Sequence, residues 1–227
     1  MKYTKQLSML AVLSSVLVLQ ACGGGSGSTP TPTYNVTIAN STNAQPFAPA
    51  AVVLHDEGYH TYVLGEMADL GLEELAEGGD GATLLASAQA NNRVVDTAAG
   101  SGLILPGAIE TIQVKGFTTS ARLSVTAMLV NTNDGFIGLD AMDLSDLAVN
   151  ESKSLQARVY DAGTEANDEA ALPGQGGEGF NELRDDRDFV AVHPGIVGMD
   201  DGFNGSALDQ SHRFDNPGAR IVVTRIQ

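Results

Sequence analysis

The chain has 227 residues, of which 28 are Asp or Glu and 12 are Lys or Arg, so its formal net charge is −16. This length suits one domain with a sizeable core. Such a negative charge repels nucleic acids and anionic lipid surfaces, and we therefore exclude both as electrostatic partners. The 26 glycines and the absence of Trp favour a loop-rich β protein over a helical bundle.

The N-terminus predicts export and a lipid anchor. Lys2 and Lys5 form a positively charged segment, and the apolar run Leu7 to Leu19 is too short to span a bilayer. We interpret residues 1–21 as a signal peptide. The next residue, Cys22, resembles the lipobox cysteine of bacterial lipoproteins, which implies a diacylated Cys22 that attaches the mature chain to the membrane. The alternative is an ordinary signal peptide that happens to carry a cysteine.

The residues after the cysteine predict a tether and a location. With only one Cys, the chain can form no intramolecular disulfide, and lipidation would account for a lone exported thiol. Residues 22–33 are rich in Gly, Ser, Thr and Pro, as in a linker that stiffens at its Thr-Pro repeats. Gly23, in place of Asp, resembles Gram-negative lipoproteins of the outer membrane. We expect an envelope lipoprotein whose folded domain spans residues 34–227.

The first half of this domain predicts short strands and two short helices. Tyr34–Asn40 alternates polar and apolar residues, as a half-buried strand does. Glu66–Ala76 and Ala82–Ala90 have helical spacing, and Gly78-Gly79 ends the first. We expect these helices to cap a sheet edge or end. Further strands are expected at Ala50–Leu54, Arg93–Val95, Leu103–Leu105 and Ile109–Val114, and a solvated acidic helix face at Glu73, Glu74 and Glu77.

Two histidines lie among carboxylates between the first strands. His55 and His60 are five residues apart, whereas zinc ligands on one helix face would be three or four apart. A zinc site is one interpretation, and solvated loop residues are the one we favour.

The centre of the chain predicts a site for a cation. Ala121–Val130 is an apolar strand followed by the loop Asn131–Asp140, and Ser154–Tyr160 is a strand followed by Asp161–Glu165. Each loop begins with acidic or amide side chains and glycine. If the strands share a sheet or face each other, their loops bring oxygens together, as in a calcium site of a β-sandwich. On the residues alone, ordinary acidic turns are the commoner explanation.

The C-terminal part completes an antiparallel β-sandwich. Ala166–Asp188 is polar and rich in glycine and acid, which predicts a long loop or flap. Strands are expected at Phe189–Val192 and Ala219–Ile226. Short strands separated by turn signals, with little helix, indicate an all-β sandwich.

Two motifs carry a family resemblance. Arg122–Val130 followed by Asn133–Leu139, and the later Tyr160-Asp161-Ala162-Gly163-Thr164-Glu165, resemble the spondin N-terminal domain. That family has a methionine-bearing strand, a Ser-Pro-Asp-aromatic turn and an Asp-Ala-Gly-Thr-Asp motif. The likeness extends from about Tyr34 to Gln227. It implies a C2-like antiparallel β-sandwich that binds calcium.

The resemblance implies three calcium ligands, Asp134, Asp161 and Glu165. Two positions differ from the family pattern: Asn133 stands where the family has Pro, and Glu165 where it has Asp. Because Glu also offers a hard carboxylate, we expect a changed affinity rather than loss of the ion. Calcium takes about six to eight oxygen ligands and tolerates irregular geometry. The loop is not an EF-hand, because it lacks that motif's spacing and terminal Glu.

The function expected from these features is a lipid-anchored, calcium-binding recognition or adhesion domain outside the cytoplasm, without catalytic activity. Its partner would be a surface or matrix protein or a glycan. One alternative is a hydrolase that uses His193 or His55 with nearby carboxylates. The chain has no Gly-x-Ser-x-Gly elbow, His-Glu-x-x-His motif or P-loop, and His212 has no recognised spacing. Another alternative is a carbohydrate-binding module, disfavoured because Trp is absent and Tyr is scarce.

Overall fold

The computed structural model describes residues 30–116, 119–168 and 179–227. The predicted signal peptide, Cys22 and most of the tether lie outside the described residues, as do residues 169–178 of the expected flap. Within the described ranges, no helix is both long enough and apolar enough to cross a membrane.

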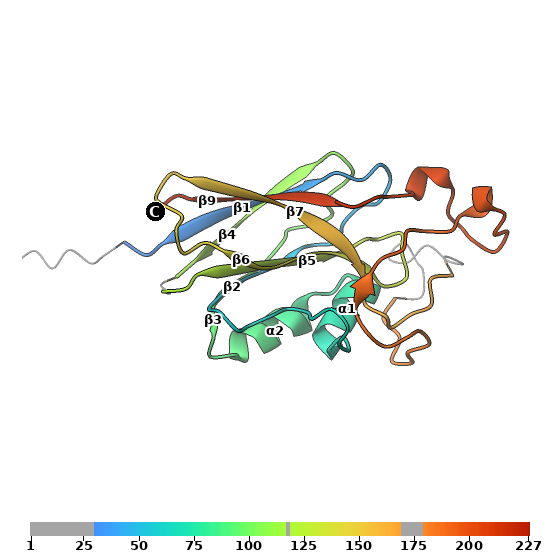
Figure 1. The fold of residues 1–227 in the computed structure, drawn as a ribbon, viewed down its shortest axis with the longest axis horizontal. Helices are drawn as coiled ribbons and strands as arrows, with labels where there is room; N and C mark the ends of the chain where they lie inside the picture. The colour runs from blue at the N-terminus through green and yellow to red at the C-terminus, as the bar shows by residue number, and fades with distance from the viewer. Residues whose placement is uncertain (1–29, 117–118, 169–178) are drawn as a thin grey trace, which may run out of the picture.

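The described chain folds into antiparallel β-layers joined through one shared strand (Figure 1). The strand order is β3-β2-β5-β6-β7-β9-β1-β4, with β8 added beside β7. The strands are β1 Thr33–Asn40, β2 Ala51–His55, β3 Val94–Ala99, β4 Ile109–Lys115, β5 Arg122–Met128, β6 Gly135–Asp143, β7 Ser152–Asp161, β8 Ala191–Val192 and β9 Ala219–Arg225. With two short helices, this architecture confirms the predicted all-β sandwich.

Strand β7 changes partner along its length. Its first part, from Ser152 to Ala157, pairs with β9. Its second part, from Arg158 to Asp161, pairs with β6. The strand therefore leaves one layer and joins the other, which holds the two layers together on one side of the molecule (Figure 1).

The main core lies between the two layers. Strands β1 and β9 contribute Val36, Ile38, Ile221 and Val223, and strands β2, β5 and β6 contribute Leu54, Leu123, Val125 and Ile137. All eight side chains are fully buried. The alternation of β1 follows directly from this packing, because every second side chain faces the core.

The helices α1 Leu70–Gly78 and α2 Ala82–Ala90 cover the outer face of β2, β5 and β6. Asp69 caps α1 by accepting from the Leu72 amide at 2.8 Å, and Gly79, with φ 71°, ends the helix as predicted. The prediction that the helices cap an edge or end of the sheet was wrong. They lie flat under it (Figure 1), so both faces of β5 are buried.

Two predictions about strands need correction. Residues 135–143 form strand β6, where the sequence predicted that a loop continues to Asp140. Its glycine at 138 is required by packing, since a Cβ there would lie 2.6 Å from the Tyr62 hydroxyl. Leu103–Leu105 is not a strand: only Ile104 forms an isolated bridge, with Phe47.

Two predictions about exposure were also wrong. Glu73 and Glu77 on α1 are buried rather than solvated. Glu73 forms an ion pair with Arg184, with an Nε to Oε1 distance of 2.9 Å, and Glu77 accepts from the Asn181 amide at 2.8 Å. The segment that follows residue 178 therefore lies over α1. His55 is likewise buried, in β2, and not a loop residue.

Candidate metal centre

The structure brings Asp134 and Asp161 together at one end of the β6–β7 pair. Asp134 directly precedes β6, and Asp161 is the last residue of β7. Gly135 is the register partner of Asp161, and the Ala162 amide donates to the Asp134 carbonyl at 3.2 Å. Neither aspartate exposes any surface to solvent. Two consecutive strands thus place two buried carboxylates side by side.

Only one carboxylate oxygen of Asp134 has hydrogen-bond donors. Its Oδ2 accepts from the Thr164 amide at 2.7 Å, the Thr164 hydroxyl at 3.2 Å and the Glu165 amide at 3.2 Å. Its Oδ1 is buried and has no partner within the described part of the chain. A buried charged oxygen without a donor is costly unless a cation satisfies it.

Asp161 is held by its own loop and by a later segment. Its Oδ1 accepts from the Gly163 amide at 2.8 Å. Its Oδ2 accepts from Asn167 Nδ2 at 2.6 Å and from Arg187 Nη2 at 3.0 Å. The Oδ1 atom of Asn167 is buried and, among the described residues, also lacks a partner. It is a second oxygen at this site that could bind a cation.

Burial shapes the electrostatics of the pair. It raises the pKa of Asp134 to about 7, and the neighbouring charge of Asp161 acts in the same direction. The amide donors of Thr164 and Glu165 oppose the shift. Burial also raises the pKa of Asp161, against the stabilising contacts of Asn167 and Arg187. Arg187 brings one positive charge to the two carboxylates, and it contacts Asp161 rather than Asp134 Oδ1.

Glu165, the third predicted ligand, reaches the site through its backbone. Its amide donates to Asp134 and its side chain is mostly buried. Across residues 30–116, 119–168 and 179–227, no three His, Cys, Asp or Glu side chains are arranged to hold a metal ion. The part that fits a hard cation is therefore the pair Asp134 and Asp161, with the amide oxygen of Asn167.

The sequence interpretation missed Asn167 and Arg187. Asn167 follows the Asp-Ala-Gly-Thr motif, and its polar type and proximity to Asp161 were the only signal. Arg187 gave none, because it lies 26 residues after its partner and is brought back by the chain path. Its guanidinium also lies over the ring of Phe189, 5.9 Å from the centroid.

Gly163 fixes the turn after Asp161. Its φ is 75°, in the left-handed region that favours glycine. A Cβ at this position would lie 2.3 Å from the Phe189 carbonyl oxygen. The absence of a side chain at Gly163 therefore lets the loop of residues 161–167 and the segment before β8 pack directly against each other.

The two histidines of the alternative hydrolase hypothesis, His55 and His193, are buried. His55 Nε2 lies 2.9 Å from Ser124 Oγ, but both residues are fully buried in the sheet. His193 follows β8, and its Nδ1 accepts from the Gly195 amide at 3.1 Å. Its Nε2 is buried and unpartnered within the described ranges, and burial lowers its pKa to about 4. His212 contacts Asp209 in an exposed turn.

Comparison with known families places this geometry in context. A family model described as Spondin_N matches residues 38–174, more than half of the chain. The matched stretch includes all three predicted ligands and Asn167, whereas Arg187 lies beyond it. No curated protein matches the chain.

Proposed function

We propose that this chain, which belongs to the spondin N-terminal domain family, is a calcium-binding recognition or adhesion domain held at the cell envelope by a lipid anchor. The family is non-enzymatic and of the extracellular recognition or adhesion type. The burial of His55 and His193 agrees with a role in binding rather than catalysis.

One observation carries the calcium assignment: Asp134 Oδ1 is buried beside a second buried carboxylate and has no hydrogen-bond partner among the residues that the structure describes. Asp134 and Asp161 would hold the ion, with Asn167 and Glu165 as further oxygen donors. Bound calcium would supply the positive charge that the pair lacks. It would thereby fix the 161–167 loop against the start of β6 and give the domain a rigid end for recognition.

The envelope location is supported by the sequence alone. A positively charged start, a short apolar run and Cys22 support cleavage after residue 21 and lipidation of the cysteine. Residues 22–33 would tether the domain of residues 34–227 to the membrane. Calcium is plentiful outside the cytoplasm, so this location and the proposed ion agree.

Calorimetric titration of calcium into chelator-treated protein tests the site. We expect saturable binding by the unaltered chain and its loss in Asp134→Asn and Asp161→Asn. Asp143→Asn is the matched control, because Asp143 lies exposed at the other end of β6, paired with Arg122. Absence of calcium binding at millimolar concentrations, or equal binding by Asp134→Asn and Asp143→Asn, would overturn the assignment.

The recognition role needs a separate test. The labelled domain should bind saturably to the surface of intact cells or to their isolated matrix, and chelation should weaken this binding. If labelled domain and an unrelated acidic control protein associate equally with these surfaces, the recognition role is refuted while the calcium site stands on its own titration.

A further inference from the structure

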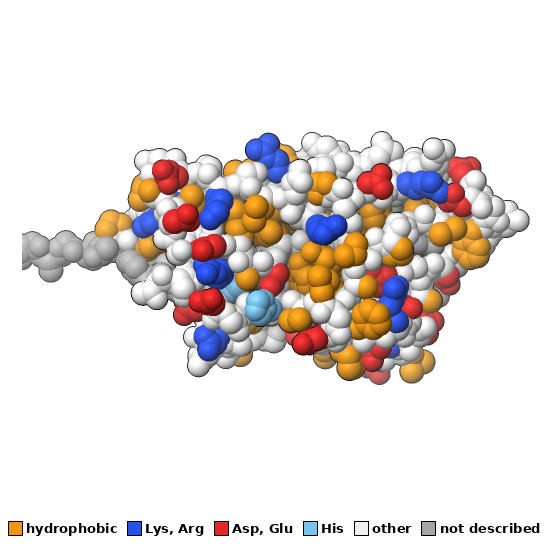
Figure 2. All heavy atoms as spheres, viewed as in Figure 1, with side chains coloured by type: hydrophobic (Ala, Val, Ile, Leu, Met, Phe, Trp, Pro, Cys, Tyr) orange, Lys and Arg blue, Asp and Glu red, His pale blue; other side chains and the backbone are white. Residues whose placement is uncertain are grey.

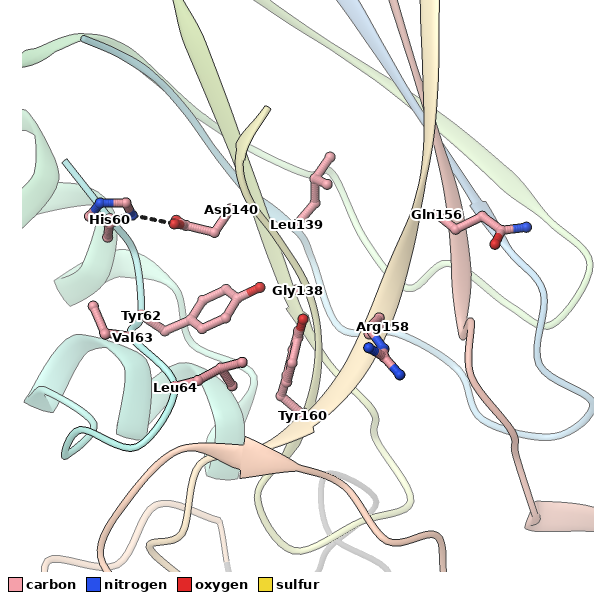
Figure 3. A pocket seen from close by; sticks show the side chains of 10 residues that line it. All are labelled: His60, Tyr62, Val63, Leu64, Gly138, Leu139, Asp140, Gln156, Arg158 and Tyr160. Carbon is pink, nitrogen blue, oxygen red and sulfur yellow. Dashed lines mark hydrogen bonds and ion pairs between the residues drawn. The ribbon is translucent and has the colours of Figure 1, made fainter. Parts of the chain in front are cut away.

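A cavity of about 570 Å³ lies where β7 separates from β6 (Figure 3), and neither Asp134 nor Asp161 lines it. Strand β6 continues to Asp143, but its pairing with β7 begins only at Arg158 and Gly138. The preceding part of β7 turns to β9 instead. The cavity is thus the wedge between two strands that diverge, and it is a consequence of the fold rather than of a mobile loop.

One wall of the cavity is apolar. Tyr62, Val63 and Leu64 lie in the segment before α1 and approach from one side in Figure 3. Val63 is 41% exposed and Leu64 52% exposed, so both offer surface to a ligand. Figure 2 shows a group of hydrophobic side chains near the middle of the face drawn, and basic and acidic side chains surround this group.

The opposite wall is polar and carries a free cation. Gln156 and Arg158 alternate with the buried Ala157 along β7, so both side chains lie on its outer face. In the part of the chain that the structure describes, no hydrogen bond or ion pair holds the Arg158 guanidinium, and its side chain is exposed. Several other arginines have carboxylate partners, as Arg184 has Glu73 and Arg213 has Asp201. In a chain with 28 acidic and 12 basic residues, an unpaired guanidinium in a cavity indicates an anionic ligand.

The cavity's own carboxylate, Asp140, already has hydrogen-bond partners on neighbouring elements. Asp140 Oδ1 accepts from the Thr61 amide at 3.0 Å and the Ser124 hydroxyl at 2.9 Å, and its Oδ2 contacts His60 Nδ1. These donors hold Asp140 on the His60 side of the cavity (Figure 3). It therefore leaves Arg158 available for a ligand.

Two tyrosines form the inner end. The rings of Tyr62 and Tyr160 lie 5.0 Å apart, and burial raises the pKa of Tyr62, so its phenol stays neutral. Gly138 beneath them has no room for a Cβ. The tyrosines provide ring surface and hydroxyl groups without a negative charge.

We propose that this cavity binds a small amphipathic carboxylate, that is, a carboxylate joined to a ring or short alkyl body. The planar guanidinium of Arg158 matches the two oxygens of a carboxylate. The body of the ligand would pack on Tyr62, Val63 and Leu64. An anion without an apolar group would leave this apolar wall exposed to water. An uncharged ligand would leave the Arg158 guanidinium without an ion-pair partner.

Titration calorimetry with phenylacetate on the full domain tests the proposal. Three comparators separate the contributions. Phenylethylamine has a similar ring but the opposite charge, and glucuronate has a carboxylate on a polar sugar ring. Inorganic phosphate is an anion without an organic group. We expect phenylacetate to bind most tightly. Equal or tighter binding of any of the three comparators would overturn the assignment of the ligand class.

Variants locate the binding. Arg158→Gln should weaken phenylacetate at least about tenfold, as expected when a charged hydrogen bond is lost. Leu64→Ser should weaken it by a smaller factor. Arg220→Gln is the matched control, since Arg220 is an exposed arginine on β9 whose Nε donates to Ser154. Equal weakening by Arg158→Gln and Arg220→Gln, with unchanged melting temperatures, would refute the site.

Discussion

Removal of the charge on Asp134 should change how stability depends on pH in the calcium-free protein. Its pKa is raised from 3.8 to about 7 in the folded state, chiefly by burial. A carboxyl group whose pKa is raised by folding favours the folded state when protonated. Its contribution is complete below about pH 4 and is lost as the pH rises through 7. Asp134→Asn lacks this group and should lose this part of the pH dependence.

The two pKa values set the size of the effect. The shift from 3.8 to about 7 corresponds to roughly 4 kcal/mol over the full pH range. Between pH 5 and pH 8 the linkage relation gives a loss of roughly 3 kcal/mol in the free energy of unfolding. Calcium at one hundred times its dissociation constant would restore about 2.7 kcal/mol at pH 8. Proton and calcium ion thus have similar effects on the same carboxylate.

Urea unfolding at pH 5 and pH 8, with chelator present, measures this directly. The difference in unfolding free energy between the unaltered chain and Asp134→Asn should change by roughly 3 kcal/mol between the two pH values. The comparison with the variant cancels the general effect of the chain's net charge of −16. If this difference in unfolding free energy is the same at both pH values, burial does not raise the pKa of Asp134, and the argument that its carboxylate needs a cation is refuted.

Three further predictions concern loop, helix and anchor. Gly163→Ala should lower the unfolding free energy by about 2 kcal/mol or more, because the φ of Gly163 is 75° and the new Cβ would clash with the Phe189 carbonyl. Thermal unfolding measures this effect. A melting temperature equal, within error, to that of the unaltered chain would contradict the prediction. Glu73→Gln should lower the free energy of unfolding by about 2 kcal/mol, because it weakens the buried ion pair with Arg184. Urea unfolding measures this loss. An unchanged free energy of unfolding would show that the ion pair does not stabilise the fold. Cys22→Ser should move the protein from the membrane fraction to the soluble fraction after cell lysis; retention at the membrane would rule out the anchor.

Local patterns predicted much of the sandwich because they reflect local causes. The alternation of Tyr34–Asn40 and the glycines after α1 report side-chain burial and backbone conformation at the positions where they occur. Strand β6 escaped prediction for the same reason. Its glycine at position 138 and its Asp140 are typical of a loop, yet Tyr62 requires the first and Thr61, Ser124 and His60 stabilise the second. These contacts come from distant parts of the chain.

The candidate sites show the same division. The residues around Asp134 and Asp161 left ordinary acidic turns as the commoner explanation, and the family resemblance was needed to single out the two carboxylates that the structure places at the ends of neighbouring strands. No local pattern could show that Arg187 returns to Asp161, or that β7 separates from β6 at Arg158. The Arg187–Asp161 contact and the separation of the two strands depend on chain path and strand pairing over long sequence separations. Such long-range contacts produce no periodic pattern in the sequence.

Strand β7 explains why the two sites are separate. Ala157 and Val159 face the core, and the same alternation places Asp161 on that side at the strand's end. Arg158 and Tyr160 point to the other face, where the cavity lies. A slip of one residue in the pairing of Gly135 with Asp161 would exchange these faces and abolish both sites together. With the register kept, a cation at the aspartates and a carboxylate at Arg158 share no contact residue, so their binding free energies should add.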